Sequence, residues 1–198
     1  MERCTARLLL RPMTGADLGW LVRLHGDRRV MRFIDDGQPV LPSVVASQTL
    51  PAMLREYGRL PDGLGYLAAI ERATGEPLGL FALRPPDSVG LRPPDNTALR
   101  PEHGTAELGY RLLPDAWGMG YATEGARALI RSASTDLGLE RVVATTMTVN
   151  TASRRVLEKA GLSLVRTFLA AWPGYIEGAE HGDVVYAAAM APYRCPRA

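Results

Sequence analysis

The chain has 198 residues, of which 46% are hydrophobic and 22% are charged, and its formal net charge is only +2. These values are typical of a globular protein that buries its core within one domain, and we expect residues 1–198 to form that domain. Because basic and acidic residues are interspersed rather than clustered, the composition indicates no nucleic-acid partner.

Targeting and metal signals are also missing from the sequence. The apolar run near the start, Leu8–Leu10, is too short for a signal peptide, and no run is long enough to cross a membrane. Cys4 and Cys195 lie near opposite ends and outside any metal-binding spacing. We therefore expect reduced thiols, a cytoplasmic location, no membrane contact and no metal. A monomer and a homodimer remain equally open.

The first half of the chain predicts helices, a strand and then an unusual loop. Residues 11–57 are expected to form two helices around the loop Arg32–Gly37, and Gly79–Leu83 is expected to be a strand. An eight-residue unit then repeats three times over residues 82–105. Three copies are too few for a solenoid, and proline removes the donors that a central strand needs. We predict a Pro/Arg-rich loop at about 84–104.

A strand, a glycine turn and a helix follow this loop. Residues 106–113 alternate like a strand, Gly118 and Gly120 come next, and apolar residues then recur with helical spacing from Ala122 to Leu137. This order points free backbone N–H groups and a helix dipole at one place, which suits a phosphate or pyrophosphate. A plain tight turn is the alternative. A dinucleotide site of the Rossmann type is disfavoured, because its glycine spacing is not matched.

A second strand and helix complete the pattern. Val142–Val149 is β-branched and apolar on both faces, as a buried central strand would be. Asn150 is a favoured helix N-cap, and the helix that we predict from Ala152 should stop at Gly161. Leu162–Leu169 again alternates like a strand.

Four segments, in this order, resemble the GNAT superfamily of acetyl-CoA-dependent N-acetyltransferases. They are Thr5–Pro12, Trp117–Glu124, Asn150–Gly161 and His181–Tyr186. Within the superfamily, they are most similar to the branch of ribosomal-protein N-terminal alanine acetyltransferases. The resemblance implies a mixed α/β fold with a mostly antiparallel sheet of about seven strands, splayed in the middle and flanked by about four helices.

The resemblance also implies where acetyl-CoA binds. The family's turn Q/R-x-x-G-x-G/A is matched here with Trp117 in the first position, so the backbone N–H groups of the turn would hold the pyrophosphate. The strand from Glu107 to Leu113 would supply an N–H to the thioester carbonyl, an effect usually worth ~3 kcal/mol. The expected cofactor contacts are Leu112, Gly118, Met119, Gly120, Tyr121, Ala122, Thr123, Asn150 and Arg155.

Catalysis needs a base, because ordinary alkyl amines are protonated at neutral pH. Glu107 is the candidate, since its strand would flank the thioester. Many members of the family use a Tyr as the acid, at a position that is Leu157 here, and the branch resembled has Ser at the position of Ser153. Ser153 is therefore the candidate acid, although a thiolate leaves well enough that no acid is required.

The acceptor would be a primary amine, either a protein or peptide N-terminus or a small molecule, which attacks directly in a ternary complex. The residues expected beside it are Phe33, Tyr175 and Glu177. The alternative is a regulatory or scaffolding protein that binds CoA without catalysis, because Leu157 replaces the family's Tyr.

Overall fold

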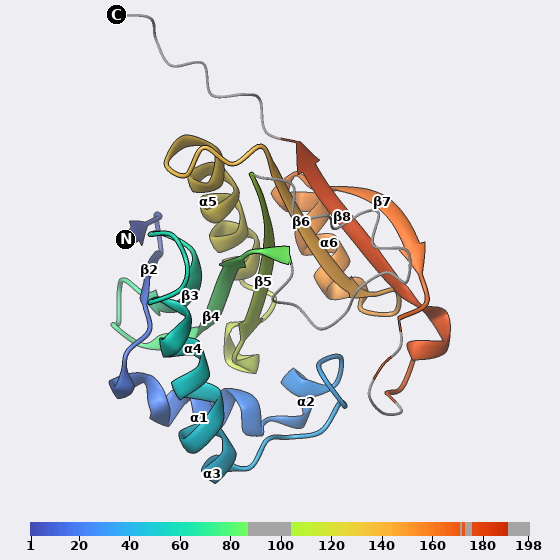
Figure 1. Cartoon of the computed structure of the whole chain (residues 1–198). Coiled ribbons are helices and arrows are strands. Elements are labelled where there is room, and N and C mark those ends of the chain that lie inside the picture. Colours follow the sequence, from blue (N-terminus) through green and yellow to red (C-terminus); the bar gives the residue numbers. More distant parts are fainter. Residues whose placement is uncertain (87–103, 171, 173–175, 190–198) are drawn as a thin grey trace, which may run out of the picture.

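The computed structural model describes residues 1–86, 104–170, 172 and 176–189. Its centre is one eight-stranded sheet in the order β1-β2-β3-β4-β5-β6-β8-β7 (Figure 1). Neighbouring strands are antiparallel except β5 and β6, which are parallel. The expected mixed, mostly antiparallel sheet is confirmed, and its strands number eight rather than about seven.

The strands are β1 (Arg3–Cys4), β2 (Leu8–Pro12), β3 (Gly65–Glu71), β4 (Pro77–Arg84), β5 (Thr105–Leu112), β6 (Arg141–Met147), β7 (Ser163–Phe168) and β8 (Asp183–Ala189). The helices are α1 (Leu18–Gly26), α2 (Arg28–Met31), α3 (Pro42–Val44), α4 (Leu50–Glu56), α5 (Tyr121–Thr135) and α6 (Thr151–Ala160). A π-helical stretch, Val45–Thr49, joins α3 to α4, and single 3-10 turns lie at Gly15–Asp17, Pro114–Ala116 and Ala179–His181.

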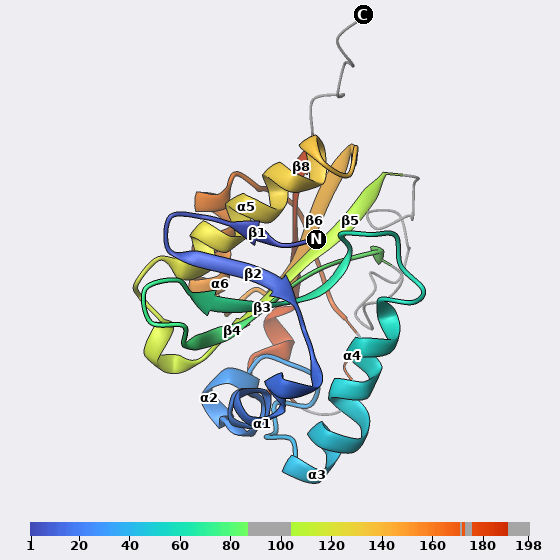
Figure 2. The ribbon, with the colours of Figure 1, turned by 90° about the vertical axis from the view of Figure 1, so that its left-hand side faces the viewer.

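The helices cover both faces of the sheet (Figure 2). On one face, α5 and α6 pack over β4, β5 and β6 around Phe81, Leu108 and Leu157. On the other face, α1 and α4 pack over β3 and β4 in a second core that contains Trp20 and Leu80. Alternate residues of each strand therefore belong to different layers.

Helix α5 packs against the sheet at a point where only glycine fits. A Cβ atom at Gly125 would stand 2.2 Å from Cζ of Phe81, which is buried in β4. Gly125 thus fixes the distance between α5 and the strands at the centre of the molecule.

The predicted caps of α6 are confirmed. Asn150 Oδ1 accepts a hydrogen bond from Ser153 N at 3.2 Å, and α6 stops at Gly161, which has a φ of 101°. Helix α5 ends at Thr135 with Asp136 as its C-cap, and Gly138, two residues further on, has a positive φ of 63°. Most of the repeat loop, residues 87–103, lies outside the described residues. Within the described part of the chain, no helix has the length and hydrophobicity needed to cross a membrane.

Candidate active site

The parallel ladder between β5 and β6 ends early. It joins three residue pairs, the last of which is Glu107 with Val143, although β5 continues to Leu112 and β6 to Met147. Beyond Glu107 the two strands are no longer paired with each other. This is the splay that the sequence resemblance implied.

Backbone donors of β5 face this gap. Leu113 N donates to Leu78 O of the neighbouring chain segment at 2.8 Å. Because successive residues of a strand direct their N–H groups to opposite sides, those of Leu108, Tyr110 and Leu112 point away from β4 and into the gap. The open side of β5 therefore offers a row of donors to an extended ligand.

A cavity of about 460 Å³ occupies the gap and the space beside it. Its walls come from β5, β6, the start of α6 and the loop after α2. It brings together four of the residues expected from the sequence, namely Phe33, Glu107, Asn150 and Ser153.

Glu107 is a buried carboxyl group at the point where the strands separate. It is 5% exposed, and its Oε2 atom has no hydrogen-bond partner among the described residues. Burial raises the pKa of Glu107 to about 7, and the Arg84 charge and the Thr145 hydroxyl oppose this rise only in part. The carboxylate is therefore available as a proton acceptor near neutral pH.

A hydroxyl pair lies on the other side of β5. The Tyr110 hydroxyl is 2.9 Å from Ser153 Oγ and also donates to Ser153 O at 3.1 Å. Burial raises the pKa of Tyr110 well above its ordinary value, so this hydroxyl keeps its proton at neutral pH. Tyr110 was not predicted from the sequence, because its partner Ser153 lies 43 residues further along the chain, beyond α5 and β6.

The glycine turn lies between β5 and α5. Gly118 and Gly120 have φ values of 73° and 82°, in the left-handed region that favours glycine. The Trp117 indole donates to Leu112 O at 2.8 Å, so this side chain ties the turn to β5. A Cβ atom at Gly118 would meet nothing within 4 Å, which leaves the turn open to a ligand.

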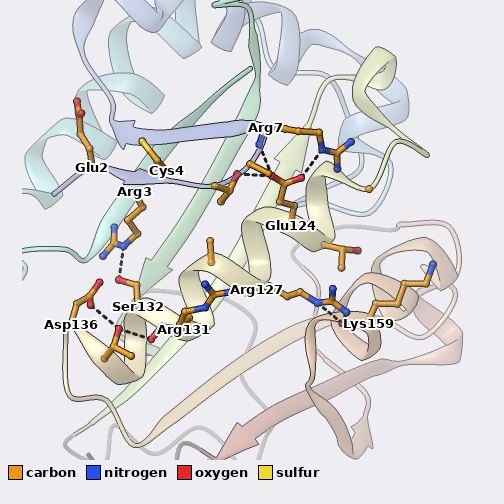
Figure 3. Close-up of a pocket in the computed structure, with 16 residues that line it drawn as sticks. Glu2, Arg3, Cys4, Arg7, Glu124, Arg127, Arg131, Ser132, Asp136 and Lys159 are labelled. Carbon is orange, nitrogen blue, oxygen red and sulfur yellow. Dashed lines mark hydrogen bonds and ion pairs between the residues drawn. The ribbon is translucent and has the colours of Figure 1, made fainter. Parts of the chain in front are cut away.

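Arg7 braces this turn from the N-terminal segment (Figure 3). Its Nη1 donates to Met119 O at 2.9 Å, and its Nε bonds Glu124 Oε2 at 2.7 Å. Its guanidinium also lies 4.4 Å from the centre of the Tyr121 ring. Arg7 was missed in the sequence because its partners lie more than 110 residues further along the chain.

The hollow drawn in Figure 3 is a separate cavity of about 790 Å³ between the N-terminal segment and α5. It is larger than the cavity at the splay, yet none of Glu107, Asn150 and Ser153 lines it. Its interactions, such as Arg3 Nε to Ser132 Oγ at 2.5 Å, hold β1 against α5. We therefore place the chemistry at the smaller cavity.

The other expected site residues are distributed around the turn and beyond it. Met119 is exposed, Thr123 borders the larger hollow, Ala122 and Leu112 pack against the core, and the Tyr121 hydroxyl donates to Glu71. Arg155 is exposed on α6 and lines neither cavity. Glu177 lies outside the cavity, with Oε2 at 3.3 Å from Arg32 Nη2, and Tyr175 lies outside the described residues.

Residues 7–163 match the acetyltransferase (GNAT) domain. The chain belongs to the GNAT family. It is an acetyl-CoA-dependent acetyltransferase, as the sequence resemblance implied.

Three relatives illustrate the range of this GNAT fold. The FsC-acetyl coenzyme A-N(2)-transacetylase of Aspergillus fumigatus is 33% identical over 92% of this chain and 73% of its own length. An acetyltransferase from Agrobacterium tumefaciens is 27% identical, with a TM-score of 0.69 over 96% of this chain and 95% of that one. The ribosomal L7/L12 α-N-protein acetyltransferase RimL, solved with coenzyme A, is 17% identical and has a TM-score of 0.72. The match covers 95% of this chain and 97% of RimL, and it shows a shared fold.

The GNAT site fits the shape and chemistry of acetyl-CoA. An open glycine turn at a helix N-terminus suits the pyrophosphate, and the N–H groups of β5 that point into the gap suit the amide-rich pantetheine arm. The side-chain nitrogen of Asn150 donates to no described residue, so it too is available at the cavity. Among the described residues, no group of three His, Cys, Asp or Glu side chains is placed to hold a metal ion.

Proposed function

We propose that the protein acetylates a primary amine that binds next to Glu107, by direct attack in a ternary complex with acetyl-CoA. Acetyl-CoA supplies a thioester whose acetyl group an amine can accept. The proposal rests on the buried Glu107 carboxyl group, which lies where β5 and β6 separate. Its pKa is about 7, and its Oε2 atom has no hydrogen-bond partner among the described residues.

Glu107 acts as the general base in this proposal. An ordinary amine arrives protonated, so a proton must leave the nitrogen before or during its attack. Oε2 of Glu107 accepts that proton directly or through one water. Its pKa near 7 supports this function, because a base works best when its pKa is close to the working pH.

The Tyr110–Ser153 pair supplies a proton on the opposite side of β5. Tyr110 and Glu107 are an odd number of residues apart, so their side chains leave the strand on different faces. A thioester held between the strands would have Glu107 on the acceptor side and the two hydroxyls on the other. We propose that the Tyr110 hydroxyl, alone or through Ser153 Oγ, donates to the sulfur atom of the departing thiolate.

The acceptor is proposed to be a small amine, with a peptide N-terminus as the second candidate. The fungal relative, whose name specifies transfer to an N(2) nitrogen of FsC, is 33% identical over nearly the whole chain, whereas the ribosomal-protein enzyme is 17% identical. The cavity volume of about 460 Å³ is also within the range of small-molecule sites.

The first experiment measures binding and turnover on the same protein. Thermal unfolding is followed with acetyl-CoA, CoA and NAD, and thiol release is then followed with a panel of small amines and short peptides. A ligand at about 100 times its dissociation constant should stabilise the fold by roughly 2.7 kcal/mol. We expect stabilisation by both CoA species and not by NAD, and amine-dependent thiol release.

Two outcomes contradict the proposal in different ways. Stabilisation by CoA without thiol release from any amine would favour the non-catalytic CoA-binding protein. The absence of stabilisation by either CoA species would contradict the placement of the cofactor at the glycine turn and the splay.

A further inference from the structure

The acceptor side of the cavity contains the guanidinium of Arg111, which has no role in the proposed reaction. Arg111 lies four residues after Glu107 on β5, so both side chains leave the same face of the strand, and both line the cavity. Their Cα atoms are therefore about 13 Å apart along the strand. The cavity has a carboxyl group near one end and a guanidinium near the other.

Arg111 differs from its neighbour Arg84 in having no partner within the described chain. Arg84 Nη1 bonds Glu56 Oε1 at 3.3 Å, and its guanidinium lies 4.6 Å from the centre of the Tyr66 ring. Arg111 donates no hydrogen bond and forms no ion pair to any described residue, although its side chain is half-buried. A guanidinium stays charged in proteins and offers five donors, so its donors are left for a ligand.

Burial makes this lone charge costly. It lowers the pKa of Arg111, and Asp35 only partly opposes that effect. Asp35 is exposed on the loop after α2, with a φ of 52°, the only positive value of a non-glycine residue in the described chain. This loop borders the same cavity, but the Asp35 carboxylate does not approach Arg111 closely enough for an ion pair.

The cofactor turn does not account for Arg111. Leu112, the next residue of β5, packs into the core under α5, so Arg111 leaves the strand on the opposite face, toward α1. There it lies opposite Leu80 of β4. Its charge adds to the effect of burial, which lowers the pKa of His25 in α1. The glycine turn at the start of α5 is on the other face of the sheet.

The wall of the cavity between Glu107 and Arg111 is formed by small residues, which leave space for a ligand. Gly109 lies between them on the same face and pairs with Ala82 of β4. A Cβ atom at Gly109 would have only the Ala82 methyl group nearby, at 4.0 Å. A substrate can therefore extend along the strand from one charged group to the other.

We infer that the acceptor amine carries a carboxylate, several bonds from the reacting nitrogen, which Arg111 binds while Glu107 receives the nitrogen. A planar guanidinium binds a carboxylate through two parallel hydrogen bonds, and the anion also offsets the repulsion between Arg111 and a cationic amine. This inference rests on the proposed function and specifies its acceptor class.

The test compares two pairs of acceptors that differ only in one carboxylate. The small-molecule pair is 5-aminopentanoate and 5-aminopentanamide, and the peptide pair is Ala-Ala-Asp-Ala-amide and Ala-Ala-Asn-Ala-amide. Each is assayed with the wild type, Arg111→Gln and Arg131→Gln. Arg131 is an exposed arginine of α5 outside the acceptor cavity, so its variant has the same change in charge.

We expect the wild type to favour the carboxylate member of at least one pair by about tenfold or more in kcat/KM, which corresponds to about 1.4 kcal/mol. Arg111→Gln should raise KM for that member and bring the ratio close to one, while Arg131→Gln keeps it. The pair that shows the preference identifies a small molecule or an acidic peptide. Stabilisation by CoA checks that each variant is folded.

Three results would overturn the inference. One is equal turnover of the carboxylate and amide members by the wild type. Another is a preference that Arg111→Gln leaves unchanged, and the third is a rise in KM for acetyl-CoA alone, which would assign Arg111 to the cofactor. Thiol release with none of the four amines would instead contradict the proposed function and this inference with it.

Discussion

Glu107→Gln should make the enzyme slower and, above neutral pH, more stable. The amide cannot accept the proton of the amine, so we expect kcat/KM to fall by about 10²- to 10⁴-fold, the usual contribution of a general base. The same substitution removes a carboxyl group that is buried with an unpartnered Oε2 atom. The two effects have opposite consequences for activity and stability.

The size of the stability effect follows from the pKa. The pKa of Glu107 rises from 4.5 to about 7 on folding. Because the folded value is the higher one, the unfolded chain ionises first, and stability is lost as the pH increases from about 4.5 to 7. This rise corresponds to about 3 kcal/mol. Glu107→Gln lacks that loss, so its stability relative to the wild type should increase by up to about 3 kcal/mol between pH 4 and pH 8.

Thermal unfolding across pH 4 to 8 measures this difference. For a chain of this length, each kcal/mol changes Tm by about 2–4 °C, so the gap between variant and wild type should widen by about 6–12 °C. The exposed Glu76 gives a matched control, Glu76→Gln, which should show no such widening. In the wild type, kcat/KM should rise about tenfold per pH unit below pH 7 and then level off.

Either of two results would refute this reasoning. A Tm gap that is the same at every pH would mean that Glu107 does not ionise with a raised pKa. A pH–rate limb near 7 that persists in Glu107→Gln would place the base elsewhere. The pH–rate profile is measured with two acceptors whose amines have different pKa values. A midpoint that reports the acceptor changes with the pKa of its amine, whereas a midpoint that reports the enzyme stays at the same pH.

Two further substitutions test the geometry around the site. Tyr110→Phe removes the hydroxyl beside Ser153 and should lower kcat by roughly 10²-fold, the lower end for general acid catalysis. The free energy of unfolding should fall by only about 1 kcal/mol. An unchanged kcat would show that the thiolate leaves without this donor. Gly125→Ala places a methyl group 2.2 Å from Phe81 Cζ and should destabilise the fold by about 1–3 kcal/mol or more, as measured by urea unfolding. An unchanged free energy of unfolding would mean that α5 can move away from the sheet.

Sequence patterns predicted the central part of the fold because its signals are local. The helices α5 and α6 have helical periodicity, a glycine at or near their ends and, for α6, an Asn cap, all within about fifteen residues. Asn150 and Ser153 were proposed from a segment that resembles the GNAT family and Glu107 from the strand expected beside the thioester, and all three line one cavity. The candidate base, the helix cap and the candidate acid could thus be proposed from the sequence.

The residues that the sequence did not supply depend on the register between distant strands. Arg84 lies opposite Glu107 only because β4 pairs with β5 in one particular register. Arg111 lies on the acceptor face by the same alternation that directs Tyr110 to the other face. Strand β3 was also missed, since its seven residues show no clear alternation and it pairs with β2, more than fifty residues away. No short window of sequence encodes such pairings.

The early end of the β5–β6 ladder divides the sheet into two lobes, β1–β5 and β6–β8, with three residue pairs as the hinge in the sheet. Hydrogen exchange should be fast for the amides of Leu108, Tyr110 and Leu112 while the gap is empty, because no neighbouring strand accepts from them. A ligand that binds both edges acts as a removable strand and completes the sheet across the hinge. The protein's rigidity would then change with every catalytic cycle, being greatest when acetyl-CoA is bound and least after CoA leaves.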